Sequence, residues 1–299
     1  MTLENINTNI DSKINSLLEK TSKKEKKILV LSGGGIKGIA HIGALKALEN
    51  MKILQNIKIF VGNSIGGLVS SMYVVGYTID ELYDFIETFN LKKFRSTNLD
   101  PSNIFTKFGI DSGDRFVIIL KKMIEAKNLN PEITFKELYE KTKLKIILVG
   151  SCLNDKTAHY FSHESHPDMP LWIGIRITTS VPIWFMPVEY KNKIYVDGGC
   201  IDNYPIGLFQ NDLDSVIGLY LSEHREYIKN IPNTEEFLMA LIQTLQEGVT
   251  CKSIMGYEKY TVLILVQQII FTNLDITLKI KKQLFSAGYT AVTNYFTKE

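Results

Sequence analysis

Hydrophobic positions in this chain fall into short uninterrupted runs separated by longer stretches with helical spacing. The runs at 27–32, 57–61, 144–150, 215–221 and 260–266 predict strands, most of them buried on both faces. From residue 27 the order is strand, glycine loop, helix, strand, glycine turn and helix. This alternation predicts an α/β fold with a mostly parallel central sheet.

The stretch from 76 to 143 is more polar and predicts three helices. Two of them begin at capping boxes, Thr78–Glu81 and Thr134–Glu137, in which the threonine and glutamate side chains satisfy each other's backbone amides. The third is predicted to begin at Asp111. We expect these helices to pack on the domain, with a share of them forming a cap over the functional site. Further helices are predicted from Pro170 to the Val181–Pro182 pair, over 235–248 and over 276–296.

Three parts of the chain follow from this pattern. Residues 1–26 are expected to form an N-terminal amphipathic helix over 3–20 and a basic linker. The polar face of that helix mixes acidic and basic side chains, which favours packing on the domain over membrane insertion. Residues 27–210 are expected to form the main α/β core. Residues 211–299 add strands and helices to the same domain.

Composition and charge exclude several classes of protein. With 45% hydrophobic and 22% charged residues, the 299-residue chain has the composition of a globular protein. A formal charge of +2 is too small to indicate nucleic-acid binding. Three scattered cysteines predict no disulfide framework and favour a reducing compartment. Without a signal-peptide pattern or an apolar run of ~20 residues, the sequence predicts a cytoplasmic protein that is neither secreted nor transmembrane.

The five residues from Gly62 to Gly66 have the G-x-S-x-G pattern of a nucleophile elbow, with Ser64 at its centre. They follow a predicted strand and precede a predicted helix, which is the context that the pattern requires. Glycines on either side of the serine allow a turn sharp enough to expose its hydroxyl. The helix N-terminus below it offers unpaired N–H groups to developing negative charge.

A glycine loop containing Gly33, Gly34, Gly35 and Gly38 follows the first strand. Its spacing also fits the G-x-G-x-x-G pattern of a dinucleotide site, but that site requires an acidic residue at the end of the second strand. The second strand ends without one, so we expect no such cofactor. Beside a serine elbow, a glycine loop is better suited to form an oxyanion hole from its backbone N–H groups.

The serine requires a general base, and two candidates follow from the sequence. Asp197 ends a predicted strand and is followed by Gly198 and Gly199, which allow the turn to approach Ser64 closely. Burial beside an apolar substrate would raise the pKa of this carboxylate and make it a better base. The alternative is a Ser64–Asp197–His224 triad, in the chain order of α/β-hydrolases.

The other histidines are weaker candidates. His41 falls in the helix after the glycine loop, where a packed or surface role is expected. The spacing of the remaining three invites a metal site with Glu164 and Asp168, but no fuller ligand set joins them; they are His159, His163 and His166. The sequence therefore predicts neither a metal nor a cofactor.

Taken together, the three glycine-containing motifs resemble those of the patatin-like phospholipase family. The glycine loop 33–38, the elbow 62–66 and the Asp197–Gly199 segment occur in the family's order with fitting separations. The segments 176–188 and Asn203–Pro205 resemble those that flank the family's aspartate. Asn63 and Tyr204 depart from the common pattern, which leaves the choice of substrate open.

The resemblance implies a three-layer α/β/α fold and hydrolysis of lipid acyl esters by a Ser64–Asp197 dyad without histidine. Lipid at a membrane surface is then the expected substrate, with peripheral membrane association during action and a possible activating protein of unknown identity. The alternatives are an esterase with the Ser64–Asp197–His224 triad, a lipase acting on neutral lipid, and a catalytically silent lipid-binding module. Four side chains are candidates for contact with an acyl chain: Trp172, Trp184, Phe185 and Met186.

Overall fold

The computed structural model describes residues 25–88, 99–100, 102–223, 230–231, 234–266 and 276–297. Within them, eight strands form a sheet in the order β10-β9-β1-β2-β4-β8-β7, and β5 pairs with β4. From β10 to β4 the strands are parallel, whereas β8, β7 and β5 run antiparallel to their neighbours. The strands are β1 (Ile28–Leu31), β2 (Ile59–Gly62), β4 (Lys145–Cys152), β5 (Thr157–Phe161), β7 (Val188–Tyr190), β8 (Lys193–Asp197), β9 (Val216–Glu223) and β10 (Thr261–Val266).

Helices cover both faces of this sheet, one face more thickly than the other. The helices are α2 (Ile39–Asn50), α3 (Ser64–Val75), α4 (Ile79–Thr88), α5 (Asn103–Lys107), α6 (Asp114–Glu125), α7 (Phe135–Thr142), α8 (Leu171–Thr178), α9 (Thr234–Ser253) and α10 (Leu278–Thr297). Leu29 and Leu31 of β1 point into the larger core, beneath most of these helices. Ile28 and Val30 point to the opposite face, where they pack with Tyr204 and Ile206. The third layer on that face consists of short 3-10 turns, against which α9 packs. This is the predicted α/β/α fold.

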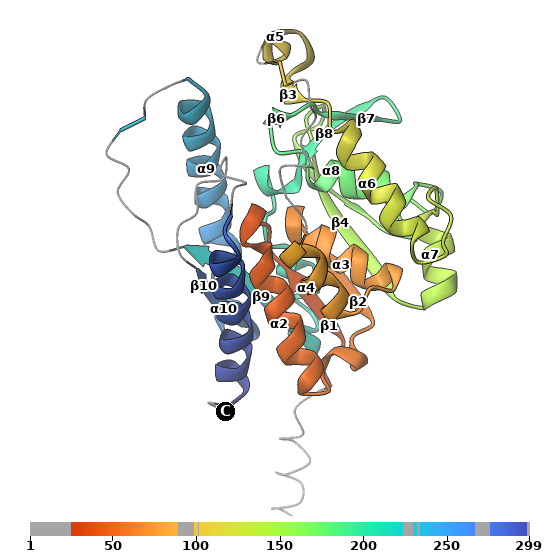
Figure 1. Ribbon diagram of the computed structural model, residues 1–299, viewed down its shortest axis with the longest axis vertical. Helices are drawn as coiled ribbons and strands as arrows, with labels where there is room; N and C mark the ends of the chain where they lie inside the picture. The colour runs from red at the N-terminus through yellow and green to blue at the C-terminus, as the bar shows by residue number, and fades with distance from the viewer. Residues whose placement is uncertain are drawn as a thin grey trace, which may run out of the picture.

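The C-terminal helix packs on the beginning of the domain, with α10 running alongside α2 (Figure 1). Two glycines allow the close contact. A Cβ atom at Gly43 would overlap the carbonyl oxygen of Phe285, and one at Gly288 would overlap that of Ala40. The last part of the chain thus contributes a helix to the same core as the first.

Most predicted elements lie where the hydrophobic pattern placed them. Both capping boxes are formed: the Glu137 N–H donates to Thr134 Oγ1 at 3.2 Å, and the Glu81 N–H to Thr78 Oγ1 at 3.1 Å. The pattern missed short elements such as α5 and β7, and also the two-stranded pair of β3 (Gly109–Asp111) and β6 (Ile183–Phe185). The predicted helix over 3–20 lies outside the described residues. No helix in the described ranges has the length and apolarity to cross a membrane.

Candidate active site

Ser64 occupies a sharp turn between β2 and α3, as the G-x-S-x-G pattern predicts. Its φ angle is +52°, in the left-handed region that non-glycine residues rarely adopt. Gly66 passes directly over the end of β1, where a Cβ atom would lie 2.6 Å from Ser32 O and 2.7 Å from Leu31 O. Glycine at this position therefore allows the turn to pack against β1 without strain, and Ser64 begins α3 directly after β2.

This close contact predicts that Gly66→Ala destabilises the protein by about 1–3 kcal/mol, the usual cost of overpacking. The added methyl group would meet backbone atoms of β1, which cannot rotate away as a side chain can. Thermal and denaturant unfolding would measure the change. Gly248→Ala in α9 is the matched control, because nothing lies within 4 Å of its Cβ position. We expect that variant to be as stable as the wild type or more so, and equal losses in both variants would contradict the prediction.

Asp197 lies at the end of β8, beside β4, where it pairs in register with Gly150. Its carboxylate is 2% exposed, and its Oδ1 accepts hydrogen bonds from the Gly199 N–H at 2.7 Å and from Asn63 Nδ2 at 3.2 Å. Its Oδ2 is buried and has no hydrogen-bond partner among the described residues. Burial raises the pKa of Asp197 to about 6, although the Ser64 hydroxyl, the Gly199 N–H and Asn63 each act to lower it. The result is a buried carboxylate poised to accept a proton near neutral pH.

Asn63, Thr178 and Asn203 connect the elbow to Asp197 and to the glycine loop. The Ser64 N–H donates to Thr178 Oγ1 at 2.9 Å, and that hydroxyl donates to Asn63 Oδ1 at 3.3 Å. Asn63 Nδ2 donates to Asn203 Oδ1 at 2.9 Å, and Asn203 O accepts the Gly33 N–H at 3.1 Å. No role for these three residues could be predicted from the sequence, since their contacts join distant segments. Their only signal was that each falls in a motif of the family resemblance.

The glycines named from the sequence surround Ser64 and Asp197. Gly33 donates its N–H to Asn203, whereas the N–H groups of Gly34 and Gly35 have no partner among the described residues. Gly35 and Gly38 line the cavity beside Ser64. Cβ atoms at Gly38 and Gly198 would overlap the side chains of Ile65 and Asn63. At Gly199, a Cβ atom would lie 3.0 Å from Asp197 Oδ1, and at Gly62 it would lie 2.5 Å from the Gly66 carbonyl carbon. Because these glycines have no side chain, neighbouring backbone and side-chain atoms can pack closely against them within the site.

A cavity of about 190 Å³ begins at Ser64 and is lined almost entirely by apolar side chains. It lies between α2, α3, α4 and α6, so two of the helices predicted to cap the site, α4 and α6, do line it. Trp184 and Phe185 form part of its wall. Trp172 does not, and its Nε1 donates to Glu132 Oε2 at 2.7 Å; Met186 is likewise outside the lining.

No described histidine forms a hydrogen bond with Ser64 or Asp197. His41 Nε2 lies 2.9 Å from Ser32 O, and complete burial lowers the pKa of this imidazole to about 4. His163 stacks on Tyr139, and His166 Nδ1 lies 3.1 Å from Ser165 Oγ. His224, the third member of the alternative triad, lies outside the described residues.

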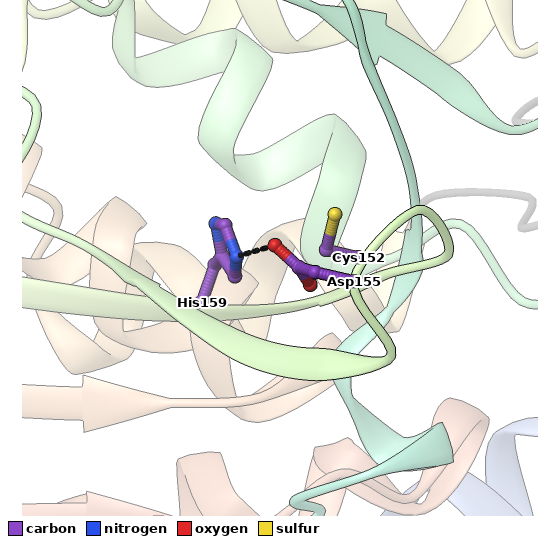
Figure 2. Close-up of side chains that lie close together, drawn as sticks. All are labelled: Cys152, Asp155 and His159. Carbon is purple, nitrogen blue, oxygen red and sulfur yellow. Dashed lines mark hydrogen bonds and ion pairs between the residues drawn. The ribbon is translucent and has the colours of Figure 1, made fainter.

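Cys152, Asp155 and His159 come together at the turn between β4 and β5 (Figure 2). Their ligand atoms lie within 4.8 Å of one another, a grouping different from the histidine and carboxylate set considered from the sequence. The Lys193 ammonium already contacts Asp155 Oδ2 at 2.9 Å, and His159 Nε2 lies at the same distance from that oxygen. Lys193 and other hydrogen-bond donors hold the pKa of Asp155 far below its usual value. Asp155 thus already pairs with the Lys193 ammonium, and the contacts among these side chains stabilise the turn between β4 and β5.

Comparison with known proteins places the chain in a family. The model of the patatin-like phospholipase family matches residues 29–209, and the chain belongs to this family. An uncharacterized protein of Acanthamoeba polyphaga mimivirus, R571, is 29% identical over 295 residues, covering 95% of this chain and 98% of that protein. A probable lipid hydrolase of Invertebrate iridescent virus 6, 463L, is 34% identical over 188 residues, covering 61% of this chain and 62% of that protein.

Among solved structures, VipD from Legionella pneumophila has the same fold, with a TM-score of 0.65 at 18% identity. The alignment covers 92% of this chain and 67% of VipD. At this level of identity the likeness concerns the fold alone. The family and the relative named as a lipid hydrolase support lipid hydrolysis as the class of reaction.

Proposed function

We propose that this protein hydrolyses fatty-acyl esters of glycerophospholipids, with Ser64 as nucleophile and Asp197 as general base. One observation carries the proposal: a strained serine faces an apolar cavity while a buried carboxylate of raised pKa lies beside it. The cavity is suited to an acyl chain, and the serine at its end is where the ester carbonyl would lie. Family membership favours phospholipid over other esters.

In the proposed reaction, Ser64 Oγ attacks the ester carbonyl carbon as Asp197 takes the hydroxyl proton. The free N–H groups of the glycine loop, those of Gly34 and Gly35, stabilise the oxyanion, and each such donor is typically worth about 3 kcal/mol. Protonated Asp197 then gives its proton to the departing alcohol oxygen, leaving an acyl-enzyme. A water molecule that loses its proton to Asp197 then attacks the acyl carbon. The bond to Ser64 Oγ breaks, Asp197 returns the proton to that oxygen, and a fatty acid is released.

Incubation of the wild type with mixed vesicles of phospholipid and triacylglycerol, followed by mass spectrometry, tests this proposal. We expect free fatty acid and lysophospholipid. Fatty acid from triacylglycerol alone would move the substrate to neutral lipid. Absence of turnover on either lipid would contradict the proposal and favour a lipid-binding module. His224→Ala distinguishes the two mechanisms, because a dyad retains its activity in this variant and a triad loses it.

The depth of the cavity predicts a preference for the length of the substrate's acyl chain. A larger side chain in the cavity wall should change that preference. Met72 lines the cavity roughly 12 Å along α3 from Ser64, at ~1.5 Å per residue, and Met123 of α6 lines it as well. Met123→Trp should lower kcat/KM for a palmitoyl ester by about tenfold or more while sparing a butyryl ester, because the larger side chain fills space that a long chain needs. Ile118→Trp, at a 54% exposed position of the same helix, is the control. An unchanged palmitoyl-to-butyryl ratio in Met123→Trp would contradict the assignment.

A further inference from the structure

The tip formed by α5 and Phe108 exposes two large aromatic side chains. Phe105 is 86% exposed and Phe108 is 65% exposed. Phe108 also has a φ angle of +63°, a conformation that a glycine would adopt without strain at the end of a helix. Exposed aromatic rings and a strained backbone are both unfavourable in an isolated protein. Exposed aromatic rings of this kind are typical of a surface that binds a partner or a membrane, where the rings are buried away from water.

The inner side of the same tip is attached to the wall of the cavity. Ile104, next to Phe105, packs against a small buried cluster that contains Trp184, and Phe185 packs against the same cluster. Trp184 and Phe185 both line the cavity. After Phe108 the chain enters β3, which pairs with β6 so that Gly109 lies opposite Ile183. Figure 1 shows α5 at one extremity of the molecule, directly beyond β3 and β6.

Arg176 fixes this strand pair to the catalytic core. Its buried guanidinium donates from Nη2 to Ser112 O at 2.9 Å and to Met186 O at 3.0 Å, one carbonyl just after each strand. It also lies 4.8 Å from the centre of the Phe185 ring. The tip is thus joined through β3, β6 and Arg176 to α8, whose Thr178 accepts the Ser64 N–H.

We propose that Phe105 and Phe108 insert into the surface of a lipid bilayer and hold the cavity against it. This inference rests on the proposed function, since an acyl chain must pass from a lipid aggregate into the cavity beside Ser64. The occupant is a bilayer because the segment that exposes the two rings also contributes Ile104 to the cluster that contains Trp184, a wall residue of the apolar cavity. Within the tip, residues 103–108, Lys107 is the one charged side chain, so insertion depends on apolar contact more than on anionic lipid.

The test compares Phe105→Ser/Phe108→Ser with the wild type on two substrates. On phosphatidylcholine vesicles we expect hydrolysis to fall roughly tenfold or more, since each ring contributes substantially to partitioning. On a water-soluble butyryl ester the rate should stay within about twofold, because the tip does not touch the reacting atoms. Met255→Ser is the control: it is 69% exposed, and its neighbours Ile254 and Tyr257 pack on the face of the sheet opposite to the cavity.

Binding is measured separately from turnover, so that the two proposals can fail independently. In a Ser64→Ala background, the double variant should sediment with phosphatidylcholine vesicles roughly tenfold less than its parent. Phe105→Trp should retain binding, and its emission, after subtraction of the parent's, should shift to shorter wavelength when vesicles are added. Equal sedimentation of parent and double variant, or no emission shift, would overturn the inference. If the wild type hydrolysed neither phosphatidylcholine nor the butyryl ester, the proposed function would be overturned, and the result of this binding test would still stand.

Discussion

Ser64→Ala should abolish ester hydrolysis, with kcat/KM falling by about 10⁴-fold or more on a soluble butyryl ester. The hydroxyl is the group that forms the acyl-enzyme in the proposed reaction. An alkyl fluorophosphonate should add to the wild type and not to the variant, as intact mass would reveal. Removal of one oxygen in a turn held by its backbone should leave the unfolding temperature nearly unchanged.

Ser71→Ala is the matched control for that experiment. Ser71 lies on the same helix, is fully buried, and its hydroxyl has no hydrogen-bond partner among the described residues. It does not line the cavity. This variant should keep full activity and fluorophosphonate labelling. If Ser64→Ala remained active, or if both variants lost activity together, Ser64 would not be the nucleophile.

The elbow could be predicted from sequence because its geometry depends on neighbouring residues. Gly62 is needed for the close contact with the first turn of α3, and Gly66 for the close approach to the end of β1, so the spacing of the two glycines itself carries the information. The buried parallel strands were equally visible, since β1 is apolar at every position and packs on both faces. Short strands such as β3 carry too few residues for any periodic signal. The pairing of β3 with β6 depends on tertiary contacts, among them those of Arg176 with the carbonyls that follow the two strands and with the Phe185 ring.

The hydrogen bonds that link the elbow to Asp197 through Asn63 could not be predicted in the same way. Asn63 joins side chains from Asp197, Thr178 and Asn203, which are more than a hundred positions away along the chain. No local pattern specifies such partners, because they depend on how β2, β8 and the end of α8 meet. The apolar cavity has the same origin: each wall residue looks like an ordinary core position until the helices are in place.

The raised pKa of Asp197 predicts a pH dependence of activity. With a pKa of about 6 in the folded protein, the carboxylate is ionised and able to accept a proton only above that pH. For the soluble ester, kcat/KM should therefore fall about tenfold per pH unit below pH 6. A profile that stays flat down to pH 4, the ordinary range of an aspartate, would contradict the role of Asp197 as base.

Asp197→Asn should lower kcat/KM by about 10³-fold or more, because the amide cannot take the Ser64 proton. The exposed Asp168→Asn should leave the rate unchanged. Asp197→Asn should also have a higher free energy of unfolding than the wild type at high pH. The folded-state pKa of about 6 lies above the ordinary 3.8, so the folded protein keeps a proton that the unfolded chain has lost between these values.

Wild-type stability should accordingly fall, relative to that of Asp197→Asn, as the pH rises from about 4 to about 6, and the difference should then level off. About two pKa units correspond to on the order of 3 kcal/mol, the cost of ionising a buried carboxylate whose Oδ2 has no partner among the described residues. Denaturant unfolding of both proteins at pH 4.5 and pH 8 would measure it. A variant that lost activity without gaining stability at pH 8 would show that Asp197 is not strained by burial. A gain in stability together with loss of turnover would mean that the fold holds this charge at a cost because the reaction needs it.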